Sequence, residues 1–208
     1  MRKLTTISIL IVIPLLVLAS SLGTTMNSYE QATDFVNPTY AYSNDSYRAT
    51  VKLEDYDVGG YWHTNSFSIP TGATIDGIVV RVDNWFTHND ASFASISIAA
   101  NDNGNYTAFT KNFPTLYTSE YQQSFGGAAD KWGNNGWSAA EINSGFLVDL
   151  KAMTEDPRNA PTWYVDYIYV WVYYTEAGQL KVNKVEAWKS LNIINTEGVN
   201  KINKVINE

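Results

Sequence analysis

The fold follows from one stretch near the end of the chain, Trp163-Tyr164-Val165-Asp166-Tyr167-Ile168-Tyr169-Val170-Trp171-Val172-Tyr173-Tyr174. Aromatic and β-branched residues dominate it, and these are residues that β-strands favour. Because successive side chains of a strand point to opposite faces of a sheet, Ile168, Val170 and Val172 share one face. The other face carries four aromatic residues, Tyr167, Tyr169, Trp171 and Tyr173. We therefore predict a strand over residues 163–174 that is aliphatic on one face and aromatic on the other.

Seven segments upstream have a similar composition and are separated by clusters of Gly, Asn, Asp and Pro. They lie near residues 47–53, 61–69, 74–86, 92–100, 106–113, 120–127 and 146–153. In the third of them Ile78, Val80 and Val82 share a core face, and Arg81 faces solvent or a partner. Short strands at close intervals are typical of sandwiches and barrels. The prediction is an all-β protein, an antiparallel jelly-roll β-sandwich of about eight strands.

Two other segments have helical patterns. Ser138 and Glu141 have the spacing of a capping box, which predicts one helical turn from Ser138 to about Asn143. In the tail, apolar residues recur every three positions from Val182 to Ile194 and resume from Val199 to Val205. This period predicts a pair of helices in an appendage over residues 177–208.

The N-terminal residues 1–23 have the layout of a signal peptide. Arg2 and Lys3 precede an apolar run from Ile7 to Ala19, and small residues follow as far as Gly23. The run is shorter than the ~20 residues that span a bilayer, so we expect cleavage after Ser21 or Gly23, with an uncleaved anchor as the alternative. Residues 24–43 would be a lead-in segment or an edge strand, residues 44–176 the sandwich, and the protein would be secreted or at the cell surface.

The composition disfavours several classes of function. Cysteine is absent, only two histidines are present, and no nucleophile motif occurs, so we expect a protein that is not an enzyme and carries no cofactor. The net charge of −7 disfavours nucleic acid and anionic lipid as partners. Loop clusters of Asp and Asn, such as Asp55 with Asp57, could hold structural calcium, but turn propensity explains the same residues and no metal ligand is assigned.

Three motifs together resemble the jelly-roll modules of phage structural proteins and prokaryotic surface proteins. They are residues 66–82, the segment from Trp132 to Trp137, and residues 165–174. The tail is similar to the Ile-Asn-Gly-Val repeats that accompany such modules, with Lys184 and Lys204 where those repeats tend to have glycine. The resemblance implies a fold and an extracellular or virion setting, without catalytic residues. The outward Tyr169 and Trp171 depart from the polar residues expected there.

Two sets of aromatic residues are candidate binding residues. Trp62, Trp85, Trp132 and Trp137 lie in or near predicted loops, where they could stack on glycans or fill the end of the sandwich core. Tyr167, Tyr169, Trp171 and Tyr173 form a stripe that monomers rarely leave uncovered, so we expect the tail, a second subunit or an extended carbohydrate to cover it. Asn44 and Asn105 match the glycosylation sequon.

The leading hypothesis is a secreted structural or adhesive module of a cell surface, filament or virion, with the stripe Tyr167, Tyr169, Trp171 and Tyr173 as its partner interface. Its partners would be further copies of itself or other surface proteins. The alternative is a carbohydrate-binding module that holds polysaccharide on its loop tryptophans.

Overall fold

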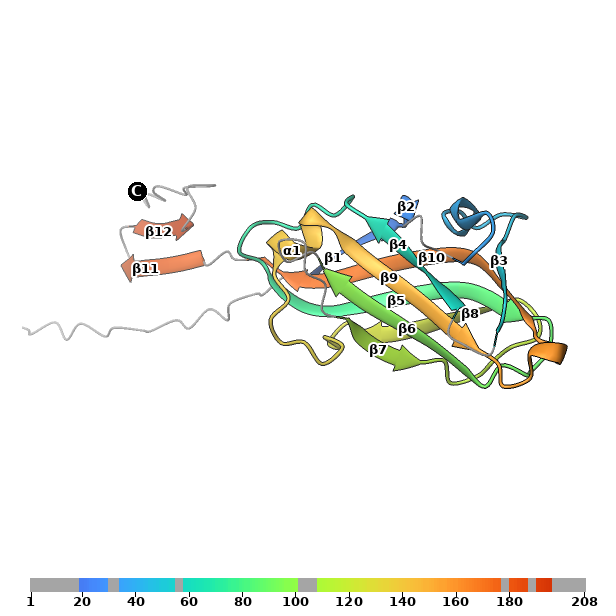
Figure 1. The fold of residues 1–208 in the computed structure, drawn as a ribbon. Coiled ribbons are helices and arrows are strands. Elements are labelled where there is room, and N and C mark those ends of the chain that lie inside the picture. The colour runs from blue at the N-terminus through green and yellow to red at the C-terminus, as the bar shows by residue number, and fades with distance from the viewer. Residues whose placement is uncertain are drawn as a thin grey trace, which may run out of the picture. The chain divides into compact units, whose positions relative to one another are not determined.

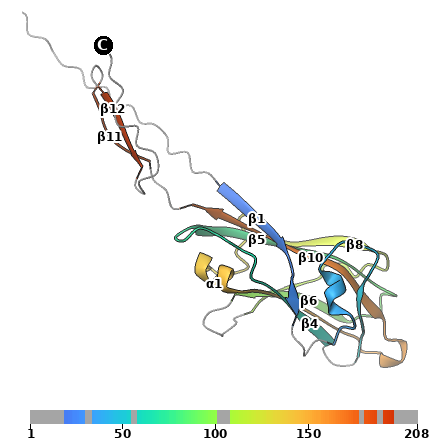
Figure 2. The same ribbon diagram turned by 90° about the horizontal axis from the view of Figure 1, so that it is seen from above.

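Two antiparallel sheets pack face to face in the computed structural model, which describes residues 19–29, 34–54, 58–100 and 108–176, and residues 180–186 and 190–195 as backbone. Sheet A contains β1 (Ala19–Thr25), β10 (Thr162–Thr175), β5 (Thr74–Phe86) and β8 (Tyr121–Gly127) in that order, with β3 (Ala49–Lys52) also paired to β10. Sheet B contains β2 (Ser28–Tyr29), β4 (Val58–Thr64), β9 (Phe146–Met153), β6 (Phe93–Ala100) and β7 (Phe109–Asn112). Figures 1 and 2 show the two layers from two directions. The prediction of an antiparallel β-sandwich is confirmed.

Successive strands mostly change sheets along the chain: β3, β5, β8 and β10 lie in sheet A, and β4, β6 and β9 alternate with them in sheet B. This crossing is the pattern of a jelly roll. The strands β5 and β9 have the predicted bounds, and β10 extends one residue beyond the prediction at each end. Ten strands form the two sheets in the described part of the chain, because β1 and β2 add to the eight that were expected.

The predicted strand over residues 61–69 is shifted in the structure, since β4 ends at Thr64. The residues that follow keep apolar side chains in the core, with Phe67 and Ile69 buried. The backbone hydrogen bonds of Ile69 are made by a side chain and not by a neighbouring strand. Ile69 N–H donates to Asn143 Oδ1 at 2.9 Å, and Asn143 Nδ2 donates to the Ile69 carbonyl at 2.8 Å. Phe67 and Ile69 therefore stay buried although this segment pairs with no described strand.

The core lies between the sheets and follows the alternation read from the sequence. The side chains of Ile78, Val80 and Val82 on β5, and of Ile168, Val170 and Val172 on β10, are fully buried. Trp163 stacks on Phe86 with ring centroids 5.2 Å apart, and its indole Nε1 donates to Asn84 Oδ1 at 3.1 Å. A buried indole N–H that has an acceptor avoids the cost of an unmade hydrogen bond.

The predicted helical turn is present as α1 (Ala139–Ser144), which lies at one end of the sandwich in Figure 2. Ser138 is its N-cap and accepts from Glu141 N–H at 3.1 Å, while the Glu141 carboxylate accepts from Ser138 N–H at 2.8 Å. Both arms of the capping box are made. Two 3₁₀ turns, η1 (Pro38–Ala41) and η2 (Pro157–Asn159), complete the helical segments of the described sandwich.

The prediction of a helix pair in the tail is wrong for the residues that the structure describes there. They form a two-stranded antiparallel hairpin of β11 (Leu180–Glu186) and β12 (Ser190–Asn195). A recurrence every three residues fits a helix, but the Val and Ile content of these segments favours strands, and the strand preference prevails. The second predicted helix, from Val199 to Val205, lies outside the described residues, as do residues 1–18 of the predicted leader.

The chain before the sandwich supplies a strand to sheet A. β1 pairs with β10 from Ala19 opposite Thr175 to Thr25 opposite Tyr169. Both predicted cleavage positions, after Ser21 and after Gly23, therefore fall within this strand. Among the described residues no helix is long and apolar enough to cross a membrane.

Glycine is required at position 23 because two aromatic rings close over it. A Cβ atom at Gly23 would lie 2.7 Å from Cε1 of Tyr169 and 2.8 Å from Cδ1 of Trp171. Both distances are well below van der Waals contact. The outward rings of β10 thus rest on the bare backbone of β1.

We predict that Gly23→Val destabilises the protein by about 1–3 kcal/mol, because the new side chain must displace Tyr169 or Trp171. Thermal unfolding would show this as a lower Tm. Ser21→Ala is the matched control, since Ser21 is exposed on the same strand. A Gly23→Val protein as stable as wild type would contradict the packing of β1 beneath these rings.

Candidate functional site

Six aromatic side chains lie on the outward face of sheet A, which we call the aromatic face. Five come from β10 and one from the neighbouring β5; they are Tyr164, Tyr167, Tyr169, Trp171, Tyr173 and Trp85. All six are partly exposed, whereas the inward residues between them on β10 are buried. At ~3.3 Å per residue, the row from Tyr164 to Tyr173 is roughly 25 Å long.

A β-bulge at Asp166 brings Tyr164 onto this face. Val165 pairs with Asn84 and Tyr167 pairs with Asp83, so Asp166 is an extra residue on β10 with no partner on β5. Strict alternation from Tyr167 backwards would have placed Val165 outward and Tyr164 inward. The bulge reverses this: Val165 is buried and Tyr164 is outward. Sequence reasoning missed Tyr164, and the only available signal was an acid within an otherwise apolar strand.

The rings contact one another along the row. Trp85 and Tyr164 stack with centroids 4.9 Å apart and an interplanar angle of 5°. Tyr169 lies between Tyr167 and Trp171, at centroid distances of 5.8 Å and 4.1 Å. The row is therefore held in place by ring contacts as well as by the sheet.

Two arginines lie over rings of this row. The guanidinium of Arg48 is 5.2 Å from the centroid of Trp85, and that of Arg81 is 4.4 Å from the centroid of Trp171. Both distances fit cation–π contacts. Arg48 also forms ion pairs with Asp166 at 3.0 Å and with Glu120 at 3.1 Å.

Two carboxyl groups beneath the face are withdrawn from water. Asp83 accepts hydrogen bonds from Asn44 Nδ2 at 2.9 Å and Gln122 Nε2 at 3.4 Å, and burial raises its pKa. Burial raises the pKa of Asp166 to about 6, despite a hydrogen bond from Asp45 N–H and the charge of Arg48. Desolvation therefore outweighs the ion pair at Asp166.

The other candidate tryptophans serve the core. Trp62 is fully buried, and its Nε1 donates to the Pro38 carbonyl at 3.0 Å, so it leaves the set of candidate ligand contacts. Trp132 and Trp137 are also buried and donate to the carbonyls of Ile78 at 3.0 Å and Lys131 at 2.8 Å. These two fill the end of the sandwich, as the alternative interpretation predicted. Of the four tryptophans, Trp85 alone joins the aromatic face.

A cavity of about 340 Å³ lies beside Trp137 at the end of the sandwich. It is lined by the turn at residues 71–75, by Lys131 and Asn135, and by the start of α1. Several of its polar groups are already used in the fold: Asn143 holds Ile69, and Ser138 caps the helix. The cavity therefore offers fewer free polar groups than its lining indicates.

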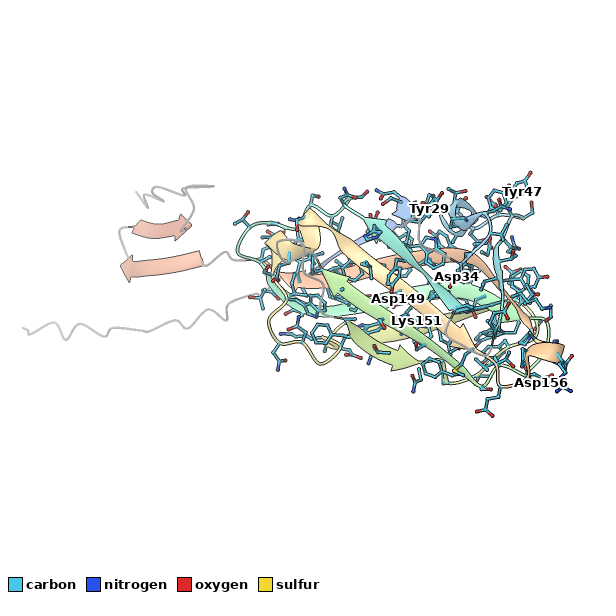
Figure 3. The ribbon with its side chains drawn as sticks, in the orientation of Figure 1. Tyr29, Asp34, Tyr47, Asp149, Lys151 and Asp156 are labelled. Carbon is cyan, nitrogen blue, oxygen red and sulfur yellow. The ribbon has the colours of Figure 1, made fainter. Side chains whose placement is uncertain are left out.

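The outward face of sheet B is polar instead of aromatic. Figure 3 shows Asp149 and Lys151 on β9, where they form an ion pair at 3.5 Å. Tyr61 lies nearby with Lys151 Nζ 5.9 Å from its ring centroid, and Ser97 shares a hydrogen bond with Thr110 at 2.8 Å. No row of contacting rings occurs on the described part of this face.

The remaining candidates divide between described and undescribed residues. Asn44 is exposed, but its amide nitrogen donates to Asp83; Asn105 lies outside the described residues. His88 Nδ1 is 3.0 Å from Asp90, and His63 lies on β4, away from it in sequence and sheet position. Within the described ranges, no group of three or more His, Asp or Glu side chains is placed to hold a metal ion; Asp55 and Asp57 lie outside those ranges.

No family model matches the sequence, and no curated protein matches it. Solved structures with a similar fold include "Family 16 Carbohydrate Binding Module-2", at 10% identity over 68% of this chain and 89% of that chain, with a TM-score of 0.41. A second, described as "CBM4 structure and function", has 13% identity over 72% of this chain and 92% of that chain, with a TM-score of 0.37. A third is SGBP-B from a complex xyloglucan utilization locus in Bacteroides uniformis, at 10% identity over 72% of this chain and 44% of that chain, with a TM-score of 0.40. The β-sandwich part of the predicted resemblance is confirmed by the two packed sheets of this chain, and the phage or surface-protein setting stays a prediction.

We predict that Asp166 makes the folded protein less stable as pH rises. Its folded pKa of about 6 exceeds the ordinary value of 3.8, so the folded state binds this proton more tightly than the unfolded chain does. The stability from this group is present below pH 3.8 and is lost as pH rises through about 6. Asp166→Asn keeps an acceptor for Arg48 and removes the titration.

Urea unfolding of wild type and Asp166→Asn at about pH 4.5 and about pH 7.5 would check this. The variant should gain stability relative to wild type at the higher pH. Glu155→Gln, at an exposed position, is the control for a general loss of negative charge. An equal stability difference between Asp166→Asn and wild type at both pH values would show that Asp166 does not titrate in this way.

Proposed function

We propose that the protein is a non-catalytic module that binds polysaccharide along the aromatic face of sheet A. The observation that carries the proposal is the row of six partly exposed, contacting rings along β10 and β5. Aromatic rings offer flat apolar surface to the C–H faces of sugars, and tyrosine hydroxyls can hydrogen-bond sugar hydroxyls at the same time. A row that runs from Tyr164 to Tyr173, roughly 25 Å long, suits an extended chain better than a single sugar.

The rings are held before any ligand arrives. Trp85 stacks on Tyr164 and contacts the Arg48 guanidinium, and Trp171 lies over Gly23 and against Tyr169. Immobilising a side chain on binding costs about 0.5–1.5 kcal/mol, so fixed rings avoid part of that cost. Large aromatic side chains also provide much contact area with few rotatable bonds.

The proposal includes export. Polysaccharides of this extended kind are met outside the cell, and residues 1–23 have the basic, apolar and small-residue regions of an export signal. Because residues 19–25 form β1 and Gly23 lies beneath the rings, the proposal takes the alternative in which this segment is retained as an anchor. The absence of cysteine from the chain makes its fold independent of the redox state of that setting. The structural or adhesive role in a filament or virion finds less support, because the rings of the stripe pack on one another, on Gly23 and on Arg81.

Binding is tested by titrating the protein with a panel of soluble polysaccharides and following tryptophan fluorescence. We expect Trp171→Ala and Trp85→Ala each to weaken binding by roughly tenfold, since each removes one anchoring ring. Tyr61→Ala is the matched control, because Tyr61 is a partly exposed tyrosine on the outward face of sheet B. Absence of binding across the panel, or an equal loss with Tyr61→Ala, would defeat the proposal.

The use of the same stripe as a subunit interface has a separate test. Tyr167, Tyr169, Trp171 and Tyr173 are all partly covered within one chain, so we expect light scattering to report a monomer at every concentration. A mass that rises with concentration in wild type, and stays monomeric in Trp171→Ala, would instead favour the interface.

A further inference from the structure

We propose that the polysaccharide held on the aromatic face is acidic, and that Arg81 binds a carboxylate of one of its sugars. This inference rests on the proposed function and adds the class of ligand. It is carried by the position of Arg81 and by the absence of an ion pair or hydrogen bond to its guanidinium among the described residues.

Arg81 lies in the middle of the aromatic face. It is on β5 directly opposite Tyr169 of β10, and Ser124 of β8 is its neighbour on the other side. Its guanidinium carbon is 4.4 Å from the centroid of Trp171. A ligand stacked on Tyr169 and Trp171 would therefore lie within reach of a guanidinium whose plane is already oriented by a ring.

Within the fold Arg81 contacts the Trp171 ring, but its N–H donors have no acceptor within the described ranges. In the described part of the chain it forms no ion pair and no hydrogen bond, and its Nε atom is buried without an acceptor. Guanidinium has five N–H donors, and those on its terminal Nη atoms are not among the buried atoms that lack a partner. These Nη donors are available to an anionic acceptor on the ligand.

Arg48 shows how the same residue type looks when its role is structural. It lies over Trp85 on the same face, but its guanidinium is occupied by Asp166, Glu120 and the Tyr47 carbonyl at 3.0, 3.1 and 2.8 Å. Lys111 and Lys151 are likewise paired, with Asp130 and Asp149. These three cations are held by acids, whereas Arg81 lies on the aromatic face without an ion pair to any described residue.

The acid nearest in sequence, Asp83, does not form an ion pair with Arg81: burial raises the pKa of Asp83 and outweighs the charge of Arg81, which lowers that pKa. Asp83 points along the same face two positions away, but its Oδ2 accepts from Asn44 and Gln122. No ion pair joins Asp83 to Arg81. Glu120 is engaged by Arg48.

A carboxylate fits this site better than a neutral hydroxyl. Guanidinium matches a carboxylate with two parallel hydrogen bonds, and charge-assisted bonds are roughly twice as strong as neutral ones. The chain's net charge of −7 opposes a polyanion at long range. Preference for an acidic sugar therefore has to come from this local contact.

The experiment compares polysaccharides that differ only in the charged group. Polygalacturonate and its fully methyl-esterified form have the same backbone, and glucuronoxylan with unsubstituted xylan is a second pair. Affinities are measured by calorimetry for wild type, Arg81→Gln, Arg81→Lys and Arg158→Gln. Arg158 is exposed on η2, so Arg158→Gln removes the same charge away from the face.

We expect wild type to bind the acidic member of a pair about tenfold more tightly or better, as one charge-assisted contact allows. Arg81→Gln should abolish that preference while keeping the affinity for the neutral member, and Arg158→Gln should leave both unchanged. Arg81→Lys should keep only part of the preference, because it retains the charge and loses the planar fork.

Two results would overturn the inference. Equal affinity for the acidic and neutral members, or a preference that survives in Arg81→Gln, would reject the acidic ligand and leave polysaccharide binding intact. Failure to bind any polysaccharide, in a protein whose circular dichroism and Tm are native, would reject the inference together with the proposed function.

Discussion

The pairing of β10 with β5 is the interaction on which the rest of the structure depends. It runs from Trp163 opposite Phe86 to Thr175 opposite Thr74, and β1 and β3 add to the free edge of β10. One face of this pair supplies Ile78, Val80, Val82 and their partners to the core; the other supplies the aromatic face. Because strand side chains alternate, a one-residue slip in this register would exchange the two faces.

The bulge at Asp166 is the point where the register is interrupted, and it has a structural cost. Asp166 is fully buried and is held by Arg48 and by the Asp45 backbone, with one carboxylate oxygen lacking a hydrogen bond. In return Trp163 turns inward to stack on Phe86, and Tyr164 turns outward to stack on Trp85. The bulge therefore costs the burial of the Asp166 carboxyl group, and it fills the core and lengthens the row of rings.

The same row of rings also explains why the N-terminal strand belongs to the domain. Tyr169 and Trp171 cover Gly23 of β1, and this is feasible only because that position has no side chain. β1 therefore supports the rings of the aromatic face and also forms an edge of sheet A. Rings supported in this way present a preformed surface, which reduces the entropy lost on binding.

The sequence by itself determined the sandwich, most strand positions and the two faces of β10, because those follow from alternation and from turn residues, which are local. The period at Ile78 to Val82 and at Ile168 to Val172 was enough to assign the core. The same reasoning failed in the tail, where a period of three residues outweighed the strand preference of Val and Ile in the prediction.

Only the tertiary structure decided which aromatic residues act together. It buried Trp62, Trp132 and Trp137, joined Trp85 and Tyr164 to the stripe, and left Arg81 without an ion pair among the described residues. These outcomes depend on a bulge, on pairing between distant strands and on which charges find partners. Such contacts are set by three-dimensional neighbours, and a local pattern of residues does not contain them.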